Sequence, residues 1–149
     1  MPTEPVPVEE VKDKLNSAWT YSNVADTSAK PVFVEVNGDG ERIRFNTQIS
    51  DTLLIRPGTP AMTENFIGNY KYGNRYYNVE VELWTKNERQ RLYDLMREIR
   101  RVVHSTKHGM TNYQRWQVTS FVEPTIATAN VWTGTITLLL ENNAILLET

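Results

Sequence analysis

The chain has 149 residues, and its 40% hydrophobic and 23% charged residues are ordinary for one globular domain. It contains no cysteine, which excludes disulfides, zinc ribbons, iron–sulfur clusters and thiol nucleophiles. The net charge of −2 favours neither wholesale nucleic-acid binding nor attraction to a membrane, and no apolar run approaches the roughly 20 residues that span a bilayer. We therefore expect a soluble protein with a single domain over residues 1–149.

The N-terminal segment predicts an arm and a helix. Residues 1–7 contain three prolines and lack the basic and apolar segments of a secretory signal, so they predict an extended arm. Apolar residues then recur at helical spacing over residues 8–19, which predicts an amphipathic helix.

The next segment predicts short strands. Residues 31–36 and 41–45 alternate apolar and polar side chains, and the Asn-Gly-Asp-Gly sequence between them favours a β-hairpin. Residues 52–56 predict a further short strand, which Pro57 and Gly58 end.

Residues 57–75 differ in character, because proline, glycine and asparagine interrupt them repeatedly while large apolar side chains remain. A loop of this length without regular structure is unusual in a compact domain and is often functional. The alternative is a hairpin that turns at residues 72–74, with residues 65–71 as its first strand. We favour a long hairpin whose tip projects and docks a partner. Its candidate docking residues are Phe66, Ile67, Tyr70 and Tyr72.

The C-terminal half predicts a β-α-β-β unit. Residues 76–84 alternate as a strand does, Thr85 and Glu88 have the spacing of a capping box, and a helix follows through Ser105. The apolar residues of this helix form a stripe wide enough to cover a sheet. Two strand-like segments close the unit, at residues 113–122 and 130–140.

The C-terminal tail, residues 142–149, is unusually apolar for a free end. It either adds a strand to this sheet or packs on a neighbouring molecule. Together the elements predict an α+β fold, in which two helices pack on one face of an antiparallel sheet that carries a long β-hairpin loop.

Charge is unevenly distributed along the chain. Residues 86–108 contain seven Lys and Arg against three acidic residues, a net charge of +4, so the rest of the chain carries −6. Opposite charges on different elements suit head-to-tail contacts between copies. The alternative is a solvated helix face, which i, i+3 pairs of Asp94 with Arg97 and of Glu98 with Arg101 partly neutralise. The candidate subunit-interface residues are Lys86, Arg89, Arg97, Arg100, Arg101, Glu80 and Glu82.

The sequence indicates no catalytic site, no metal site and no cofactor. His104 and His108 have the i, i+4 spacing of metal ligands, but the neighbouring Lys107 and the lack of a third ligand favour a role at the helix end. Glu80 and Glu82 share a strand face, where solvated carboxylates are commoner than an acid/base pair. Neither a glycine-rich phosphate loop nor a nucleophile elbow is found. We therefore expect a protein that is not an enzyme.

The order of the elements resembles the tail-terminator and tail-completion proteins of tailed viruses. The resemblance rests on the opening helix at residues 8–19, the loop-bearing strand pair around residues 57–75, the strand at residues 79–84 that leads into the basic helix, and the closing strand at residues 131–140. It implies a virion subunit that forms a ring, typically a hexamer, which caps the tail tube and joins it to the neck or connector. It further implies that DNA is met only in passage.

Two other hypotheses follow from the residues themselves. The basic helix at residues 86–105, together with the aromatic side chains, suits a small nucleic-acid-binding or regulatory module. A small-molecule enzyme with its site under residues 57–75 is the third hypothesis. Affinity that falls steeply with salt would favour nucleic-acid binding over ring assembly.

Overall fold

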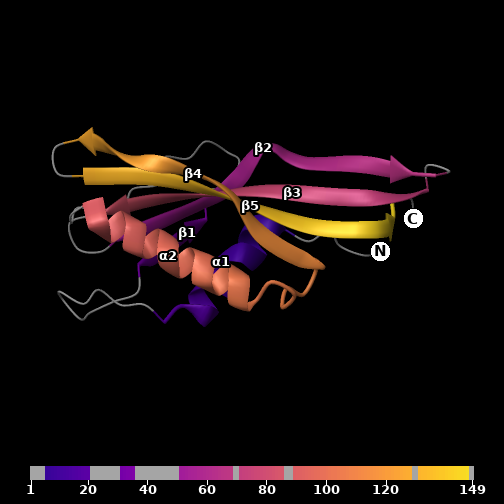
Figure 1. The fold of residues 1–149 in the computed structure, drawn as a ribbon, viewed down its shortest axis with the longest axis horizontal. Helices are drawn as coiled ribbons and strands as arrows, with labels where there is room; N and C mark the ends of the chain where they lie inside the picture. The colour runs from indigo at the N-terminus through magenta and orange to yellow at the C-terminus, as the bar shows by residue number, and fades with distance from the viewer. Residues whose placement is uncertain are drawn as a thin grey trace.

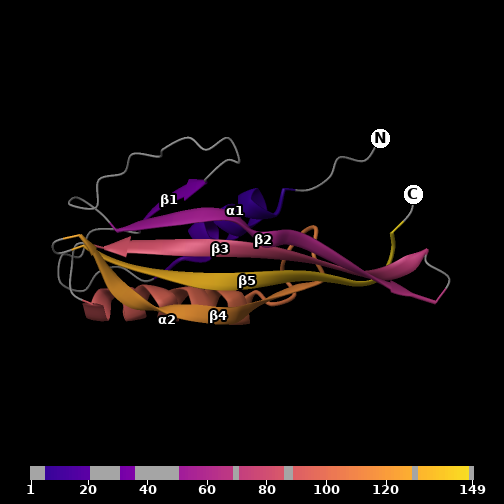
Figure 2. The ribbon, with the colours of Figure 1, turned by 90° about the horizontal axis from the view of Figure 1, so that it is seen from above.

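The computed structural model describes residues 6–20, 31–35, 51–68, 71–85, 89–128 and 131–147. It has an α+β fold in which two helices lie against one face of a five-stranded sheet, as expected from the sequence (Figure 1, Figure 2). The strand order is β1-β2-β3-β5-β4, and every pair is antiparallel except β1 with β2. The elements are α1 (Pro7–Ala18), β1 (Val32–Glu35), β2 (Thr52–Ile67), β3 (Tyr72–Thr85), α2 (Arg89–Ser105), β4 (Arg115–Thr128) and β5 (Val131–Leu146).

The helix α1 begins at Pro7, whose fixed φ and missing N–H suit the first helical position. Val8, Val11 and Leu15 are buried at helical spacing, and they place α1 against β1, β2 and β3. The predicted helix at residues 8–19 is therefore confirmed to within one residue at each end. Residues 1–5 of the predicted arm lie outside the described residues.

The helix α2 covers the other part of the same sheet face, where it contacts β3, β4 and β5. It ends at Ser105, as predicted, and its apolar stripe is buried as predicted. Thr85, the predicted first residue of the capping box, is instead the last residue of β3, and Lys86, Asn87 and Glu88 lie outside the described residues. The buried apolar residues of α2 are Leu92, Leu95, Met96, Ile99, Val102 and Val103.

The core lies between these helices and alternate residues of the central strands. Each strand directs every second side chain to the helices, and in β3 these alternate positions are fully buried. Trp116 of β4 is also fully buried, and its indole Nε1 donates a hydrogen bond to the carbonyl oxygen of Thr106 at 2.9 Å. The fully buried core residues of β3 and β5 are Val79, Val81, Leu83, Ile136, Leu138 and Leu140.

The strand β2 is longer than the sequence predicted. Pro57 and Gly58 do not end it: they begin a bulge, after which pairing with β3 resumes at Met62 and continues to Ile67. The favoured long hairpin is thus present, but β2 ends at Ile67 and β3 begins at Tyr72, so the predicted turn residues 72–74 belong to β3 instead. Proline and glycine interrupt the ladder without stopping the strand, because a bulge absorbs the residues that cannot pair.

The C-terminal tail continues β5 and does not form a separate element. Its residues up to Leu146 pair with β3, so the tail joins this sheet, as one of the two alternatives had it, but it does so by extending β5 and not as an added strand. The expected turn and second strand of the hairpin at residues 31–45 lie outside the described residues, while β1 itself pairs in parallel with β2.

A buried ion pair joins three elements at one end of the sheet. The Asp51 carboxylate, just before β2, accepts a hydrogen bond from the Thr85 hydroxyl at 2.5 Å and another from Arg91 Nε at 2.6 Å. All three residues are buried. Because the charges of Asp51 and Arg91 are both removed from water, each requires the other.

Truncating the stripe of α2 tests the core. We expect Leu95→Ala to lower the free energy of unfolding by about 2–5 kcal/mol, because it leaves a cavity beneath the helix. Urea denaturation measures the change. The exposed Arg97→Ala on the same helix is the control, and its change should stay within about 0.5 kcal/mol. Equal losses for the two variants would contradict the assigned helix face.

Removing the charge of Asp51 tests the buried ion pair. Asp51→Asn keeps the side-chain shape but removes the buried carboxylate charge that pairs with Arg91, so we expect a loss of about 3–5 kcal/mol in unfolding free energy. Asp13→Asn, at an exposed position of α1, should change little. A loss of less than about 1 kcal/mol for Asp51→Asn would show that the pair is hydrated in solution.

Candidate functional site

Three strands extend beyond the helices as a narrow ribbon. The strand β1 pairs only with the first part of β2, and β4 begins opposite Glu141, so only β2, β3 and β5 continue past this point. At about 3.3 Å per residue, the 16 residues of β2 span roughly 50 Å, whereas the 17 residues of α2 span only about 25 Å. We call residues 64–67, 72–75 and 142–146 the distal ribbon, and Figure 2 shows it projecting past both helices.

Large apolar side chains are exposed at the end of the distal ribbon. Phe66, Ile67, Tyr72 and Leu146 are 58%, 48%, 51% and 46% exposed, respectively. Ile67 pairs with Tyr72 and Tyr72 with Leu146, so these three side chains form a row across one face. Phe66 pairs with Gly73 and belongs to the opposite face, the one that carries the helices nearer the core. Three of the four predicted docking residues are therefore at the tip, and Tyr70 lies outside the described residues.

Gly73 allows the distal ribbon to be tightly packed at this point. A Cβ atom there would lie 2.1 Å from the carbonyl oxygen of Asn65 and 2.7 Å from Leu147 Cδ1. The Leu147 side chain thus fills the place that a larger residue would need, and its N–H donates to the Lys71 carbonyl at 2.8 Å. These contacts hold the last residues of β5 against the hairpin turn.

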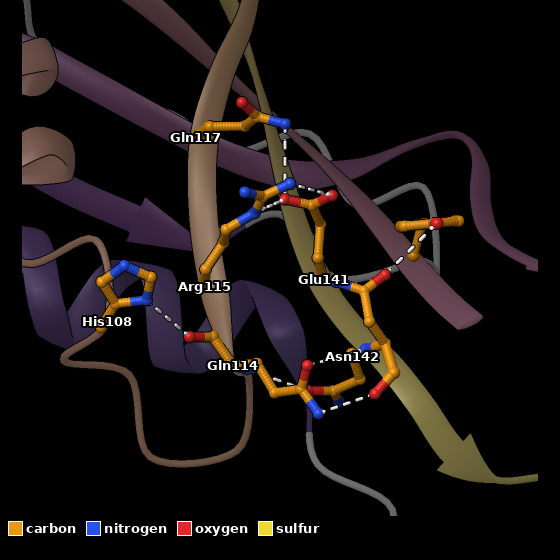
Figure 3. A network of polar contacts seen from close by, with 8 residues as sticks. His108, Gln114, Arg115, Gln117, Glu141 and Asn142 are labelled. Atoms are coloured by element: carbon orange, nitrogen blue, oxygen red, sulfur yellow. Dashed lines mark hydrogen bonds and ion pairs between the residues drawn. The ribbon is translucent and has the colours of Figure 1, made fainter. Parts of the chain in front are cut away.

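A polar network braces the base of the distal ribbon, where β4 begins beside β5 (Figure 3). Arg115 and Glu141 form an ion pair across the two strands, and the hydrogen bond and charge of Glu141 raise the pKa of Arg115 above its ordinary value. Gln114 N–H donates to Asn142 Oδ1 at 2.9 Å, and the Gln114 side chain exchanges hydrogen bonds with the Asn143 backbone. The network fixes the point at which the sheet narrows.

A pocket of about 500 Å³ lies between the start of α1 and the β2–β3 hairpin. Most of its lining is apolar. Among the described residues of the lining, the charged side chains are Glu64 and Arg75, whose carboxylate oxygen and guanidinium nitrogen lie 3.6 Å apart. The lining residues are Val6, Pro7 and Val8 from α1 and its cap, Pro57, Ala61, Met62 and Glu64 from β2, and Arg75, Tyr77, Asn78 and Val79 from β3.

The bulge in β2 explains why a pocket forms there. Pro57 pairs with Val79 and Met62 with Tyr77, so residues 58–61 all lie opposite Asn78. Gly58 makes this possible, because a Cβ atom at this position would lie 2.7 Å from Asn78 Cβ. Asn78 Nδ2 in turn donates to the Pro60 carbonyl at 3.0 Å and holds the bulged backbone in place. The sequence analysis did not predict this pocket, although Pro57 and Gly58 signalled the irregularity that forms it.

The predicted basic face of α2 is smaller than the sequence suggested. Arg89, Arg97 and Arg100 are exposed, but Arg91 is buried against Asp51. Arg101 pairs with Glu98, as one alternative predicted, and its Nη2 also donates to the carbonyl oxygen of Ala18 at 2.7 Å. Arg101 therefore joins α2 to the end of α1. Lys86 lies outside the described residues.

Glu80 and Glu82 lie on the sheet face away from the helices, and Arg56 of β2 binds both carboxylates. Burial lowers the pKa of the Arg56 guanidinium, but the hydrogen bond to Glu80 and the charges of both carboxylates outweigh it, so the pKa is raised. Glu82 also accepts a hydrogen bond from the Trp84 indole at 2.5 Å. The two carboxylates are thus partly buried and neutralised within the subunit, rather than simply solvated.

His104 lies in the last turn of α2, whereas His108 follows the helix and lies beside Gln114 of the polar network (Figure 3). His104 is exposed near the helix end, and His108 Nδ1 lies 3.3 Å from the carbonyl oxygen of Gln114. Among the residues that the structure describes, no group of three or more His, Asp or Glu side chains is arranged to hold a metal ion. No helix within these ranges has the length and apolarity needed to cross a membrane.

No protein-family model matches the chain, and no curated protein matches it significantly.

Shortening the hairpin tests whether the distal ribbon is separable from the core. Asn65 and Asn74 are cross-strand partners, so residues 66–73 can be replaced by Asn-Gly, which favours a tight hairpin turn. We expect the variant to fold with an unfolding free energy within about 1 kcal/mol of the parent, because it loses exposed side chains and no core contacts. Circular dichroism and urea denaturation measure this. Loss of cooperative unfolding would show that the tip belongs to the folding core.

Proposed function

We propose that this protein is a non-enzymatic structural subunit that assembles into a ring, of the kind that terminates the tail tube of a tailed virus and joins it to the neck. The observation that carries the proposal is the distal ribbon, a three-stranded projection that ends in exposed apolar side chains. Contiguous exposed apolar groups commonly mark interaction sites. A projection of this shape suits contact with another protein better than the enclosure of a substrate.

The charges of the two helices support a ring of identical subunits. The exposed Arg97 and Arg100 of α2 have no ion pair within the described ranges, and the same holds for the exposed carboxylates Glu9 and Asp13 of α1. Contact between α2 of one copy and α1 of the next would pair these charges head to tail, and such heterologous contacts close into rings. Glu80 and Glu82 are less suitable partners, because Arg56 already neutralises them.

Charge reversal tests this arrangement. We expect the parent protein to form annular oligomers, and the Arg97→Glu/Arg100→Glu variant to be monomeric with its fold intact, because both residues are exposed. The Glu9→Lys/Asp13→Lys variant should also be monomeric. An equimolar mixture of the two should reassemble, since alternating copies place opposite charges at every contact. Light scattering and negative-stain electron microscopy measure the outcome.

Two results would contradict the proposal. A strictly monomeric parent protein at micromolar concentration would remove the ring. Normal assembly of the Arg97→Glu/Arg100→Glu variant, combined with loss of salt-dependent oligonucleotide binding, would instead favour the nucleic-acid-binding alternative.

A further inference from the structure

Exposed apolar side chains gather at two places in the described part of the chain. Val6 and Met62 are 55% and 41% exposed at the pocket between α1 and the β2–β3 hairpin. Phe66, Ile67, Tyr72 and Leu146 are exposed at the end of the distal ribbon. Val122 of β4 is the one other large apolar residue exposed within the described ranges. The described part of the chain thus carries an apolar concavity and an apolar projection, and none of the residues in the described ranges covers either of them.

The concavity and Phe66 lie on the same face of the hairpin. Tyr77 and Val79 point toward the helices and line the pocket. Alternation along β3 brings Gly73 to this same face, and Phe66 is its cross-strand partner. A single chain therefore presents the pocket and the aromatic ring in the same direction, displaced along the strands.

Phe66 lies outside the pocket of its own chain, because its side chain is 58% exposed and is not among the lining residues. Glu64, which lines the pocket, is two positions before Phe66 on the same face, about 7 Å away in an extended strand, whereas Ala61 at the bulge is five positions and roughly 17 Å away. The intervening residues of β2 pair with β3 throughout, from Met62 with Tyr77 to Ile67 with Tyr72, so the hairpin cannot fold back on itself. A Phe66 ring that packs against Ala61 and Met62 at the bulge would therefore come from another molecule.

We propose that the pocket receives Phe66 from the distal ribbon of a second copy of this chain. Its volume of about 500 Å³ accommodates an aromatic side chain, and its walls are mainly apolar. The polar groups at its edge already have partners, because Glu64 pairs with Arg75 and Asn78 binds the Pro60 carbonyl. Entry of an aromatic ring therefore leaves no buried charge uncompensated, and it covers the exposed parts of Val6 and Met62.

This inference rests on the proposed function and names the partner that one face of the distal ribbon contacts. The row of Ile67, Tyr72 and Leu146 lies on the opposite face, and it stays exposed when Phe66 is seated. One face would then hold neighbouring copies together, and the other would remain for contact with a different protein of the assembly.

Crosslinking tests the contact directly, because the natural chain has no cysteine. Ala61→Cys places one thiol in the pocket, and Ile145→Cys places another beside Phe66, since Ile145 pairs with Gly73 on the same face. A short bis-maleimide should join the two single-cysteine proteins when they are mixed. The control replaces Ala61→Cys with Ser120→Cys on β4, which is exposed and far from the pocket, and it should give no specific product.

Two substitutions make the result specific. Phe66→Asp should reduce crosslinking about tenfold or more, because a buried aromatic anchor commonly dominates a contact. Val122→Asp changes an equally exposed apolar residue elsewhere and should leave crosslinking unchanged. In the Ala61→Trp/Met62→Cys variant, the cysteine moves to position 62 and the indole fills the pocket. Crosslinking of this variant to Ile145→Cys should also be lost. Circular dichroism confirms that each variant is folded.

The double variant Ala61→Cys/Ile145→Cys separates this inference from the proposed ring. A ladder of covalent products larger than a dimer supports both proposals. Products limited to a dimer support the seating of Phe66, because each of two copies then places its Phe66 in the pocket of the other. The same result contradicts the ring. The absence of crosslinks that depend on Phe66, in a protein that still forms annular oligomers, overturns this inference and leaves the ring standing.

Discussion

The architecture depends on a mismatch of length between the strands and the helices that cover them. A sheet is stable where a second layer buries one of its faces, and here α1 and α2 supply that layer over only part of β2, β3 and β5. Beyond the helices the strands continue with backbone pairing but without a second layer. The same strands therefore contribute core residues at one end and an exposed apolar surface at the other.

The two ends of the sheet are stabilised by different interactions. At the end covered by the helices, buried aliphatic residues dominate, and the buried ion pair of Asp51 with Arg91 ties the start of α2 to the sheet. At the junction with the distal ribbon, the contacts are mainly polar, and the pair of Arg115 with Glu141 is partly exposed. Such a junction orients the projection without extending the hydrophobic core.

Most of the fold followed from periodicity in the sequence. The stripe from Leu92 to Val103 and the alternation in β3 are local patterns, and each predicts which residues meet the core without knowledge of the partner element. The extent of β2 was not predicted, because Pro57 and Gly58 usually end a strand, and only its pairing with β3 shows that it continues. The turn of the hairpin was misplaced for the same reason.

The candidate site was predictable only in part. Phe66, Ile67 and Tyr72 stood out as apolar residues in an interrupted segment, and the structure places them at the tip. The pocket was missed because its walls come from α1, β2 and β3, and no local pattern brings these together. Arg91 was counted with the surface charges, since one sequence cannot show that Asp51, forty residues earlier, meets it in the interior.

Because of the distal ribbon, the two ends of one strand differ in their stability against local opening. We expect amide groups in the covered part of β3 to exchange hydrogen with solvent only when the whole domain opens. Those between Tyr72 and Arg75 need only local separation of three strands that no helix holds down. Fluctuations at the tip can therefore occur without disturbing the core. A projection of this kind adjusts its shape to a partner during association, while the body of the subunit keeps its form.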